Sequence, residues 1–435
     1  MRDLLRRGKS RALHSDGRRA TILGGGRMQK IAVRCCIAGG GPAGVMAGLL
    51  LARAGVDVVV LEKHADFFRD FRGDTIHPST LELMHELGCL DEFLALPHQE
   101  ARQLAFQIGE TRGVIADFTR VKLRCPFIAL MPQWDFLDFL AHRAARYPTF
   151  SLKMSAEANG LLEEGGKVVG VTAATPRGPL EIRADLVIAA DGRHSLVREQ
   201  AGLAVDELGA PMDVLWFSLK RQPGDPNETM GRLDSGRMVV AIDRGDDWQF
   251  GYVIPKGTSD ALRARGLAAF QRSVAEAVPY VADRVAALDD WDKIKLLTVQ
   301  VNRLKRWHRP GLLCIGDAAH AMSPVGGVGI NLAVQDAVAA ANLLAAPLAA
   351  RRLTDDDLAA VQKRREFPVK ITQAFQIFVQ NRVLVPTLKG ATMKPPLIVT
   401  LLQRFPALRG IPARLIGVGV RPEHIRVPAR WPEKG

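Results

Sequence analysis

The chain has 435 residues, of which 47% are hydrophobic and 24% are charged, and these fractions are those of an ordinary globular protein rather than a disordered one. The length allows two or three domains. The formal net charge is +13, but residues 1–30 hold nine Lys/Arg against two Asp/Glu, so more than half of the excess positive charge belongs to one end of the chain.

Residues 1–28 are predicted to be a basic, disordered tail, because they have no apolar segment of signal-peptide length and no periodicity. Three interpretations compete: a solvated or nucleic-acid-touching arm, an organelle transit peptide, or a stretch upstream of a natural start at Met28. We favour the last, since Met28 lies a few residues before the first strand. The tail has no interleaved aromatic residues, so we expect no nucleic-acid partner.

The cysteines show no C-x-x-C pair and no metal-ligand spacing, so we expect no metal site. They are Cys35, Cys36, Cys89, Cys125 and Cys314. Buried free thiols in a reducing cytoplasm are the simplest interpretation. No stretch of 18 apolar residues lacks glycine turns and charges, so no membrane span is expected.

The first predicted unit is a strand at 33–38, a glycine turn, a helix at 41–54 and a second strand at 56–61 that ends at Glu62. Gly39, Gly41 and Gly44 form G-x-G-x-x-G. Such a turn brings backbone N–H groups and a helix N-terminus to a pyrophosphate, and a carboxylate about 20 residues later accepts from ribose hydroxyls. The pattern predicts a dinucleotide site, FAD or NAD rather than NADP, against the plainer alternative of a βαβ unit without a ligand.

The next segments are predicted in chain order. Pro78 starts a helix at 78–88, residues 102–130 contain a hairpin with its turn at 109–113, and residues 133–147 form an amphipathic helix. Strands at 168–172 and 180–182 form another hairpin, and a buried strand follows at 186–190.

The second half begins with several strands at 211–256, which predict a separate antiparallel sheet. A helical stretch at 259–288, a strand at 295–302, a buried strand at 312–315 and an alanine-rich helix at 329–348 follow, and 355–435 is mostly helical. The fold class is therefore α/β: a Rossmann-like parallel sheet, interleaved with an antiparallel sheet, and a helical C-terminal region.

Three separated motifs carry a resemblance to a known family. They are the glycine motif at 39–44, Asp191-Gly192, and Gly316-Asp317-Ala318-Ala319-His320 with Pro324, Gly327, Gly329 and Asn331. In order and separation they resemble the FAD-dependent aromatic hydroxylases of the para-hydroxybenzoate hydroxylase type. The resemblance covers about residues 29–345.

The resemblance implies a set of FAD-contacting residues. They are Gly39, Gly41, Pro42, Ala43, Gly44, Glu62, Lys63, Arg72, Gln133, Asp191, Gly316, Asp317, Pro324, Gly327, Val328, Gly329, Ile330 and Asn331. The plainer alternatives are a helix-capping Asp317, a surface ion pair for Arg72 and a solvated Gln133. Val328 stands where many relatives have glutamine, so that side-chain contact is in doubt while the backbone contacts of the loop are not.

Elementary physics agrees with two of these implied roles. Asp317 follows a buried strand, where its carboxylate can accept from a ribityl hydroxyl. The turn through Pro324 to Gly329 starts a helix whose positive N-terminus can stabilise negative charge on the reduced flavin. His77 and His320 are not assigned to catalysis, because one precedes a helix and the other has no partner at ligand or triad spacing.

The resemblance also implies a division of the chain. Residues 29–101, 131–210 and 296–350 would bind FAD, residues 102–130 and 211–295 would form the substrate domain, and residues 351–435 would be a helical C-terminal region.

The implied activity is a monooxygenase with noncovalent FAD, reduced transiently by NADPH or NADH, that hydroxylates an aromatic or quinone-like apolar molecule with O2 through a flavin C4a-hydroperoxide. An FAD-dependent reductase or dehydrogenase is the nearest alternative, followed by a non-enzymatic flavin-binding redox partner. Halogenases of this fold carry Trp-x-Trp-x-Ile-Pro, and here Tyr252 replaces the second tryptophan.

The strands at 211–256 are expected to form one wall of the substrate pocket. Their aromatic and large apolar residues are Trp216, Phe217, Met238, Phe250 and Tyr252. Strand alternation requires about half of them to face a core instead. The apolar, cation-bearing C-terminal region either packs as a helical layer, which is the plainer prediction, or makes peripheral membrane contact.

Overall fold

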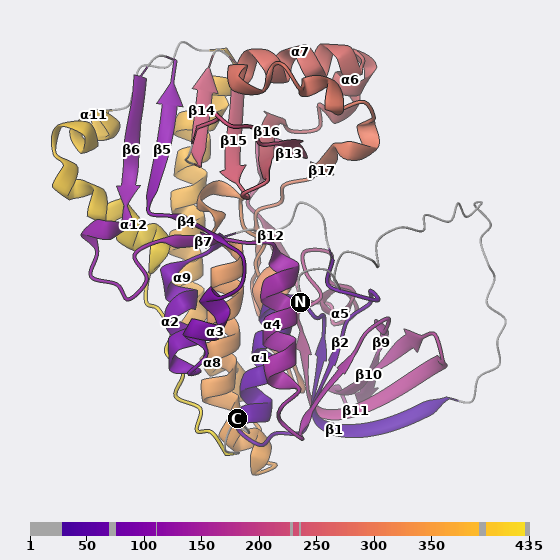
Figure 1. The fold of residues 1–435 in the computed structure, drawn as a ribbon. Helices are drawn as coiled ribbons and strands as arrows, with labels where there is room; N and C mark the ends of the chain where they lie inside the picture. Colours follow the sequence, from indigo (N-terminus) through magenta and orange to yellow (C-terminus); the bar gives the residue numbers. More distant parts are fainter. Residues whose placement is uncertain are drawn as a thin grey trace.

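The computed structural model describes residues 28–68, 75–109, 111–226, 229–234, 236–390 and 397–430. Two β-sheets, one above the other in Figure 1, and the helices packed on them make up most of this part. Residues 1–27 of the predicted tail and Arg72 lie outside the described residues.

The lower sheet has eight strands. They are β1 (Gln29–Ala38), β2 (Val58–Leu61), β8 (Phe150–Lys153), β9 (Glu157–Glu164), β10 (Lys167–Thr175), β11 (Gly178–Ala189), β19 (His308–Arg309) and β20 (Leu312–Cys314). The strands β20, β11, β1, β2 and β8 lie side by side in this order and run parallel, while β9, β10 and β19 pair antiparallel. All four residues of β2 are buried, as expected where both faces of a parallel sheet are covered.

Helices α1 (Pro42–Arg53), α4 (Gln133–Ala144) and α8 (Gly329–Ala349) pack together beside this sheet. Gly48 lets α1 approach closely, since a Cβ atom there would lie 2.7 Å from Cγ2 of Val60. The helix at 325–349 is long and apolar enough to cross a membrane by composition, and 78% of its most apolar window is buried inside the protein. It is the central core helix of this layer.

The upper sheet has seven strands. They are β5 (Gln103–Ile108), β6 (Thr111–Asp117), β13 (Met212–Lys220), β14 (Met230–Asp234), β15 (Arg237–Asp243), β16 (Asp247–Pro255) and β17 (Lys295–Leu297). Their order is β17-β13-β16-β15-β14-β5-β6, and every pair is antiparallel except β14 with β5. Helices α6 (Ser259–Ala264) and α7 (Leu267–Ala277) cover its outer face (Figure 1).

Short elements join the two layers. They are β3 (Thr75–Ile76), β4 (Gln99–Ala101) and β7 (Ile128–Leu130) in one small sheet, β12 (Val205–Glu207) and β18 (Asn302–Leu304) in another, and helices α2 (Pro78–Glu86), α3 (Leu90–Leu94) and α5 (Leu196–Gln200).

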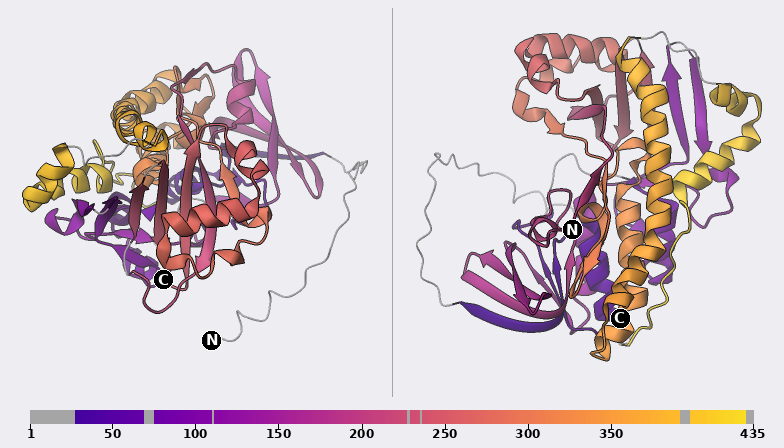
Figure 2. Two further views of the ribbon diagram at one scale, coloured as in Figure 1. Left: turned by 90° about the horizontal axis from the view of Figure 1, so that it is seen from above. Right: turned by 180° about the vertical axis from the view of Figure 1, so that it is seen from behind.

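The C-terminal region spans both layers, as Figure 2 shows from behind. It contains α9 (Asp355–Val379), the π-helical turn η7 (Gln380–Leu384), α10 (Val385–Leu388), α11 (Leu397–Arg404) and α12 (Gly410–Gly417). Thr354 and Asp357 form a capping box that starts α9 beside β19, whereas α10 packs against β15 and α12 against β6. One continuous helix therefore connects the lower sheet to the upper one.

The α/β architecture and the order of its main elements agree with the sequence predictions. Two strand predictions are wrong in detail. Residues 180–182 and 186–189 belong to the single strand β11, which ends one residue before the predicted end, because Arg183 and Asp185 point outward to Glu164 and Arg34 while Ile182 and Leu186 stay buried. The predicted strand at 295–302 is interrupted at Val299, whose N–H donates to Asp213.

A third prediction also needs correction. The hairpin at 102–130 ends at Asp117, after which β7 leaves it and pairs with β3 and β4.

All five cysteines are free and buried. Burial raises the pKa of the Cys36 and Cys314 thiols well above the ordinary range. These side chains pack in the core as small apolar groups.

Candidate active site

The turn between β1 and α1 has the close approaches that a dinucleotide turn requires. Gly39 has φ +108, and a Cβ atom there would lie 2.3 Å from the Ala190 carbonyl oxygen. A Cβ atom on Gly44 would lie 1.9 Å from the carbonyl oxygen of Gly39. A Cβ atom on Gly41 would meet nothing within 4 Å, so this glycine leaves open space at the N-terminus of α1, where Pro42 is the first residue.

Glu62 follows β2 beside this turn and is 9% exposed. Its Oε2 accepts from the Gly40 N–H at 3.1 Å and its Oε1 accepts from the His64 N–H at 3.0 Å. These bonds hold the carboxylate against the glycine turn, and its role as a ribose acceptor stays a prediction. Lys63 points into solvent.

The second motif lies against the first. Asp191 follows β11, the neighbour of β1, and the contact between Gly39 and Ala190 joins the two turns. Asp191 Oδ2 accepts from the Val197 N–H at 3.2 Å, whereas its Oδ1 is buried without a hydrogen-bond partner among the described residues. Burial raises the pKa of Asp191, and hydrogen bonds from Ser195 and Val197 offset part of that rise.

The third motif meets both. Gly316 has φ +59 and begins the 3-10 turn η5 (Gly316–Ala318), where a Cβ atom would lie 3.1 Å from Cβ of Ala43 in α1. Asp317 Oδ2 lies 3.6 Å from Nη2 of Arg193, the residue after Asp191-Gly192. The three motifs that the sequence separates by more than 270 residues thus meet at one edge of the lower sheet.

The loop after Pro324 supplies a second helix N-terminus. Gly326 and Gly327 have φ +80 and +63, and the Gly327 carbonyl accepts from Thr75 Oγ1 at 2.9 Å. Helix α8 then begins at Gly329, where a Cβ atom would meet nothing within 4 Å, and its first turn carries no acidic residue. The positive end of this helix is bare.

Helix α8 continues with Ile330, which is buried, and Asn331. Asn331 Oδ1 accepts from the His77 backbone N–H at 3.1 Å and from Thr80 Oγ1 at 2.6 Å, while Asn331 Nδ2 is buried without a partner in the described chain. Val328 is half-buried and precedes the helix.

These features fit FAD. Two helix N-termini are left open by glycine at positions 41 and 329, and two buried polar atoms, Asp191 Oδ1 and Asn331 Nδ2, lack partners within the described ranges. Unpaired buried polar atoms are costly, so they indicate a missing polar ligand.

Gln133 is the first residue of α4, and its neighbour Trp134 packs on Phe68 with ring centroids 4.9 Å apart. It therefore lies beside the segment that follows Glu62. Arg72 belongs to the same segment but falls in the part of the chain that is not described.

His77 is buried, and its Nδ1–H donates to the Ile416 carbonyl at 2.8 Å. Burial lowers the pKa of His77 to about 4, although the backbone carbonyls of Ile416 and Gly327 oppose the shift. The neutral ring connects α12 with α2 and the loop before α8, which is a structural role.

A buried charge network was not predicted from the sequence. Asp336 of α8, which is 0% exposed, accepts from His320 Nε2 at 2.6 Å, from the Gly316 N–H at 3.1 Å and from Arg365 Nε at 3.0 Å. Burial opposes its ionisation, but His320 and Arg365 outweigh that effect and hold the pKa of Asp336 below its usual range. A carboxylate within an alanine-rich helix was the available signal.

The network reaches the C-terminal segment through Glu423. Arg365, 1% exposed, donates to Glu423 at 3.3 Å, and Arg364 binds the same carboxylate at 2.6 and 3.2 Å. The turn that carries Asp317 is thereby tied to α9 and to residues 418–430. Within the described ranges, no group of three or more His, Cys, Asp or Glu residues could hold a metal ion.

Comparison with known proteins agrees with this geometry. A family model of the FAD binding domain matches residues 32–374. The chain belongs to the FAD-dependent aromatic hydroxylase family. It is 34% identical over 384 residues to 6-methylpretetramide 4-monooxygenase of Streptomyces rimosus, covering 87% of this chain and 91% of that protein. It is 27% identical to 3-demethoxyubiquinol 3-hydroxylase of Escherichia coli over 332 residues, covering 71% and 78% of the two chains.

Solved structures share the fold of this FAD-dependent oxidoreductase. The p-nitrophenol 4-monooxygenase of Pseudomonas putida superposes with a TM-score of 0.72 at 21% identity, covering 89% of this chain and 96% of the other. The myxobacterial chondrochloren halogenase gives a TM-score of 0.70 at 19% identity, covering 92% and 100%. At these identities the likeness shows the fold alone.

Replacing Asp317 should weaken FAD retention far more than replacing His320. Asp317 is partly exposed at the meeting point of the motifs, whereas His320 is 1% exposed and bonds only within the protein interior. We expect Asp317→Ala to raise the Kd for FAD about tenfold or more, the loss of one hydrogen bond to a charged group. His320→Ala should mainly lower the melting temperature. Flavin titration followed by fluorescence measures the first effect, and equal Kd values in both variants would contradict the site.

Breaking the buried network should destabilise the fold. Arg365→Met leaves Asp336 and Glu423 with one cation fewer in the interior, so the free energy of unfolding should fall by about 3 kcal/mol in urea titrations with excess FAD. Arg364→Met is the matched control, because Arg364 pairs with the same Glu423 but is 31% exposed. Equal losses in the two variants would contradict a special role for the buried guanidinium.

Because His77 is buried as a neutral ring, the protein should become less stable as the pH falls. Its pKa is about 4 when folded against 6.5 for the free side chain, so His77 has no effect above pH 6.5. As the pH falls from 6.5 toward 4, the unfolded chain takes up a proton that the folded chain refuses, which costs about 1 kcal/mol by pH 5.5.

We expect His77→Asn to reduce the loss of unfolding free energy between pH 7.5 and 5.5 by that amount. His85→Asn, at an exposed position of α2, is the control and should leave the loss unchanged. An identical pH dependence in wild type and His77→Asn would refute the prediction.

Proposed function

We propose that this enzyme hydroxylates a fused-ring phenolic substrate, with FAD as the bound cofactor and NADPH or NADH as the transient reductant. The balanced reaction consumes the aromatic substrate, O2, NAD(P)H and a proton, and yields the hydroxylated product, water and NAD(P)+. The observation that carries the proposal is the convergence of the three motifs beside an apolar sheet face. The relative from Streptomyces rimosus supports the fused-ring substrate, since it matches over most of both chains and is named for 6-methylpretetramide.

Bound FAD supplies the redox chemistry, accepting a hydride from the nicotinamide and activating O2 for transfer to the ring. The residues of the chain itself would bind FAD and orient it. The bare N-terminus of α1 suits the pyrophosphate, Glu62 the adenosine ribose and Asp317 the ribityl chain. The N-terminus of α8 would stabilise negative charge on the reduced ring.

The upper sheet and the C-terminal helices would exclude water and orient the substrate. Tyr252 stands at the position of the second halogenase tryptophan. Its hydroxyl forms a hydrogen bond with Ser273 Oγ at 2.7 Å, and its ring packs in the core between the upper sheet and α7, which supports hydroxylation over halogenation.

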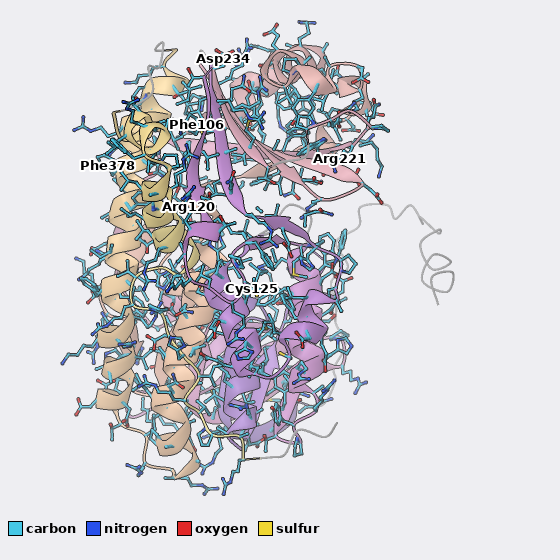
Figure 3. All side chains as sticks on the ribbon, turned by 60° about the vertical axis from the view of Figure 1, so that its left-hand side comes forward. Phe106, Arg120, Cys125, Arg221, Asp234 and Phe378 are labelled. Carbon is cyan, nitrogen blue, oxygen red and sulfur yellow. The ribbon has the colours of Figure 1, made fainter. Side chains whose placement is uncertain are left out.

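Peripheral membrane contact stays a prediction. Apolar side chains are exposed along the C-terminal helices, and Phe378 projects from the outer side of α9 in Figure 3. They are Phe367, Ile371, Phe378, Leu401, Phe405, Ile411 and Leu415.

The proposal is tested with purified protein, which should be yellow and hold FAD noncovalently. A panel of phenols, quinone precursors and aromatic polyketides should contain members that stimulate NAD(P)H and O2 consumption, and mass spectrometry should find a gain of one oxygen. A colourless protein that takes up no FAD would contradict the proposal. Stimulated NAD(P)H oxidation that needs no O2 would favour the reductase alternative.

A further inference from the structure

The two faces of the upper sheet differ in what covers them. Phe217, Phe250 and Tyr252 point outward into a core with α7, so three of the five predicted pocket residues are excluded from the pocket. Trp216 and Met238 lie on the inner face and pack on the same apolar cluster as Val325, in the loop before α8. The inner face therefore looks toward the candidate flavin loop.

The inner face of the upper sheet is almost entirely apolar. Its side chains in β13, β15 and β16 are apolar over the middle of each strand, with Ser218, Gln249 and the indole N–H of Trp216 as the polar groups. Lys220 and Asp247, at the strand ends, pair with each other at 2.9 Å and leave the middle of the face uncharged.

Two polar atoms on this face lack partners. Trp216 Nε1, a donor, and Gln249 Oε1, an acceptor, are both buried without a hydrogen bond to any described residue, and Gln249 is only 1% exposed. Trp216 pairs in register with Gly251 and Gln249 with Ser218, so the two residues are diagonal neighbours on adjacent strands, with Cα atoms roughly 7 Å apart.

Each orphaned group costs about 1–3 kcal/mol unless something pairs with it. The unpaired atoms that we assign to FAD, on Asp191 and Asn331, lie on other elements, so a second ligand could pair with Trp216 Nε1 and Gln249 Oε1.

The indole itself is held in place. A Cβ atom on Gly251 would lie 3.1 to 3.4 Å from three ring atoms of Trp216, so the absence of a side chain at 251 lets the ring lie against β16. A rigid ring with its N–H at a buried position is a preorganised donor.

We infer that Trp216 and Gln249 anchor the substrate, and that this substrate is a neutral aromatic carrying both a ring carbonyl and a phenol hydroxyl, not an aromatic carboxylic acid. The indole N–H donates to the carbonyl oxygen, and Gln249 Oε1 accepts from the hydroxyl. The inference rests on the proposed function, which it narrows to a substrate class.

The placement of charge supports a neutral ligand. The cation that follows β15, Arg244, stacks over the ring of Trp134 at 5.8 Å; burial and Asp138 raise the pKa of Asp135, and Arg244 offsets part of that rise. Its charge is thus engaged by the start of α4. Among the described residues, a carboxylate on the inner face would be buried against apolar groups without a free cation, which is strongly unfavourable.

The test uses the FAD-loaded enzyme and three matched probes: 2-hydroxyanthraquinone, the parent anthraquinone and anthraquinone-2-carboxylate. Perturbation of the flavin absorbance gives each Kd. Wild type should bind the hydroxyl probe at least about tenfold more tightly than the carboxylate, because a buried group without its partner loses about that factor.

The variants isolate each anchor. Trp216→Phe keeps a six-membered aromatic ring and removes the pyrrole ring with its N–H, so it should weaken both neutral probes about tenfold. Gln249→Met removes the acceptor, so it should weaken the hydroxyl probe about tenfold and leave the parent anthraquinone unchanged. Tyr252→Phe, which removes a hydroxyl from the outer face, is the control and should bind all probes as wild type does.

A second measurement separates anchoring from a structural role. Gln249 Oε1 is unpaired within the described chain, so Gln249→Met should not lower the melting temperature; Trp216→Phe also removes packed ring atoms, so it is judged by its binding constants alone.

Wild-type affinity for the hydroxyl probe in both variants, a loss of melting temperature in Gln249→Met, or tight binding of the carboxylate would overturn the inference, and so would failure of wild type to bind either neutral probe. These outcomes differ from failure of the proposed function, in which the protein takes up no FAD or shows no substrate-stimulated use of O2.

Discussion

The arrangement of the site depends on one buried carboxylate, Asp336. It lies on the core helix α8 and accepts from the backbone N–H of Gly316, the residue before Asp317, while His320 and Arg365 each bind one of its carboxylate oxygens. A charge in the interior is tolerated only with such partners. The position of the third motif is therefore set by the packing of α8 and α9 rather than by its own loop.

Close contacts between backbone segments bring the motifs together. Gly39 and Gly44 allow contacts that no side chain would permit, and these contacts place the β11 and β1 turns against each other. Gly316 allows a similarly close contact with α1. Three segments far apart in the chain become one edge because the carboxyl ends of parallel strands meet there.

Much of this could be read from the sequence. The glycine turn, α1 and β2 are local, since their signals lie within 30 residues, and strand alternation foretold that only part of the aromatic set near 216–252 faces the pocket. Which part could not be foretold, because it depends on where α6 and α7 dock.

The Asp336 network was out of reach for a similar reason: Arg365 and Glu423 are 58 positions apart, and no spacing rule joins them. The unpaired atoms of Trp216 and Gln249 become visible only when every other partner has been placed.

The buried cysteines bear on how the enzyme survives its own chemistry. An oxygenase that activates O2 without a bound substrate releases hydrogen peroxide, and peroxide attacks thiolates rather than thiols. Burial raises the pKa of the Cys35, Cys36 and Cys314 thiols and keeps them protonated and out of solvent, and the neighbouring Cys36 raises the pKa of Cys35 further. The strands β1 and β20, which lead into the first and third motifs, thus contain sulfur atoms that an oxidant cannot readily reach, so uncoupled turnover should spare the scaffold of the candidate site.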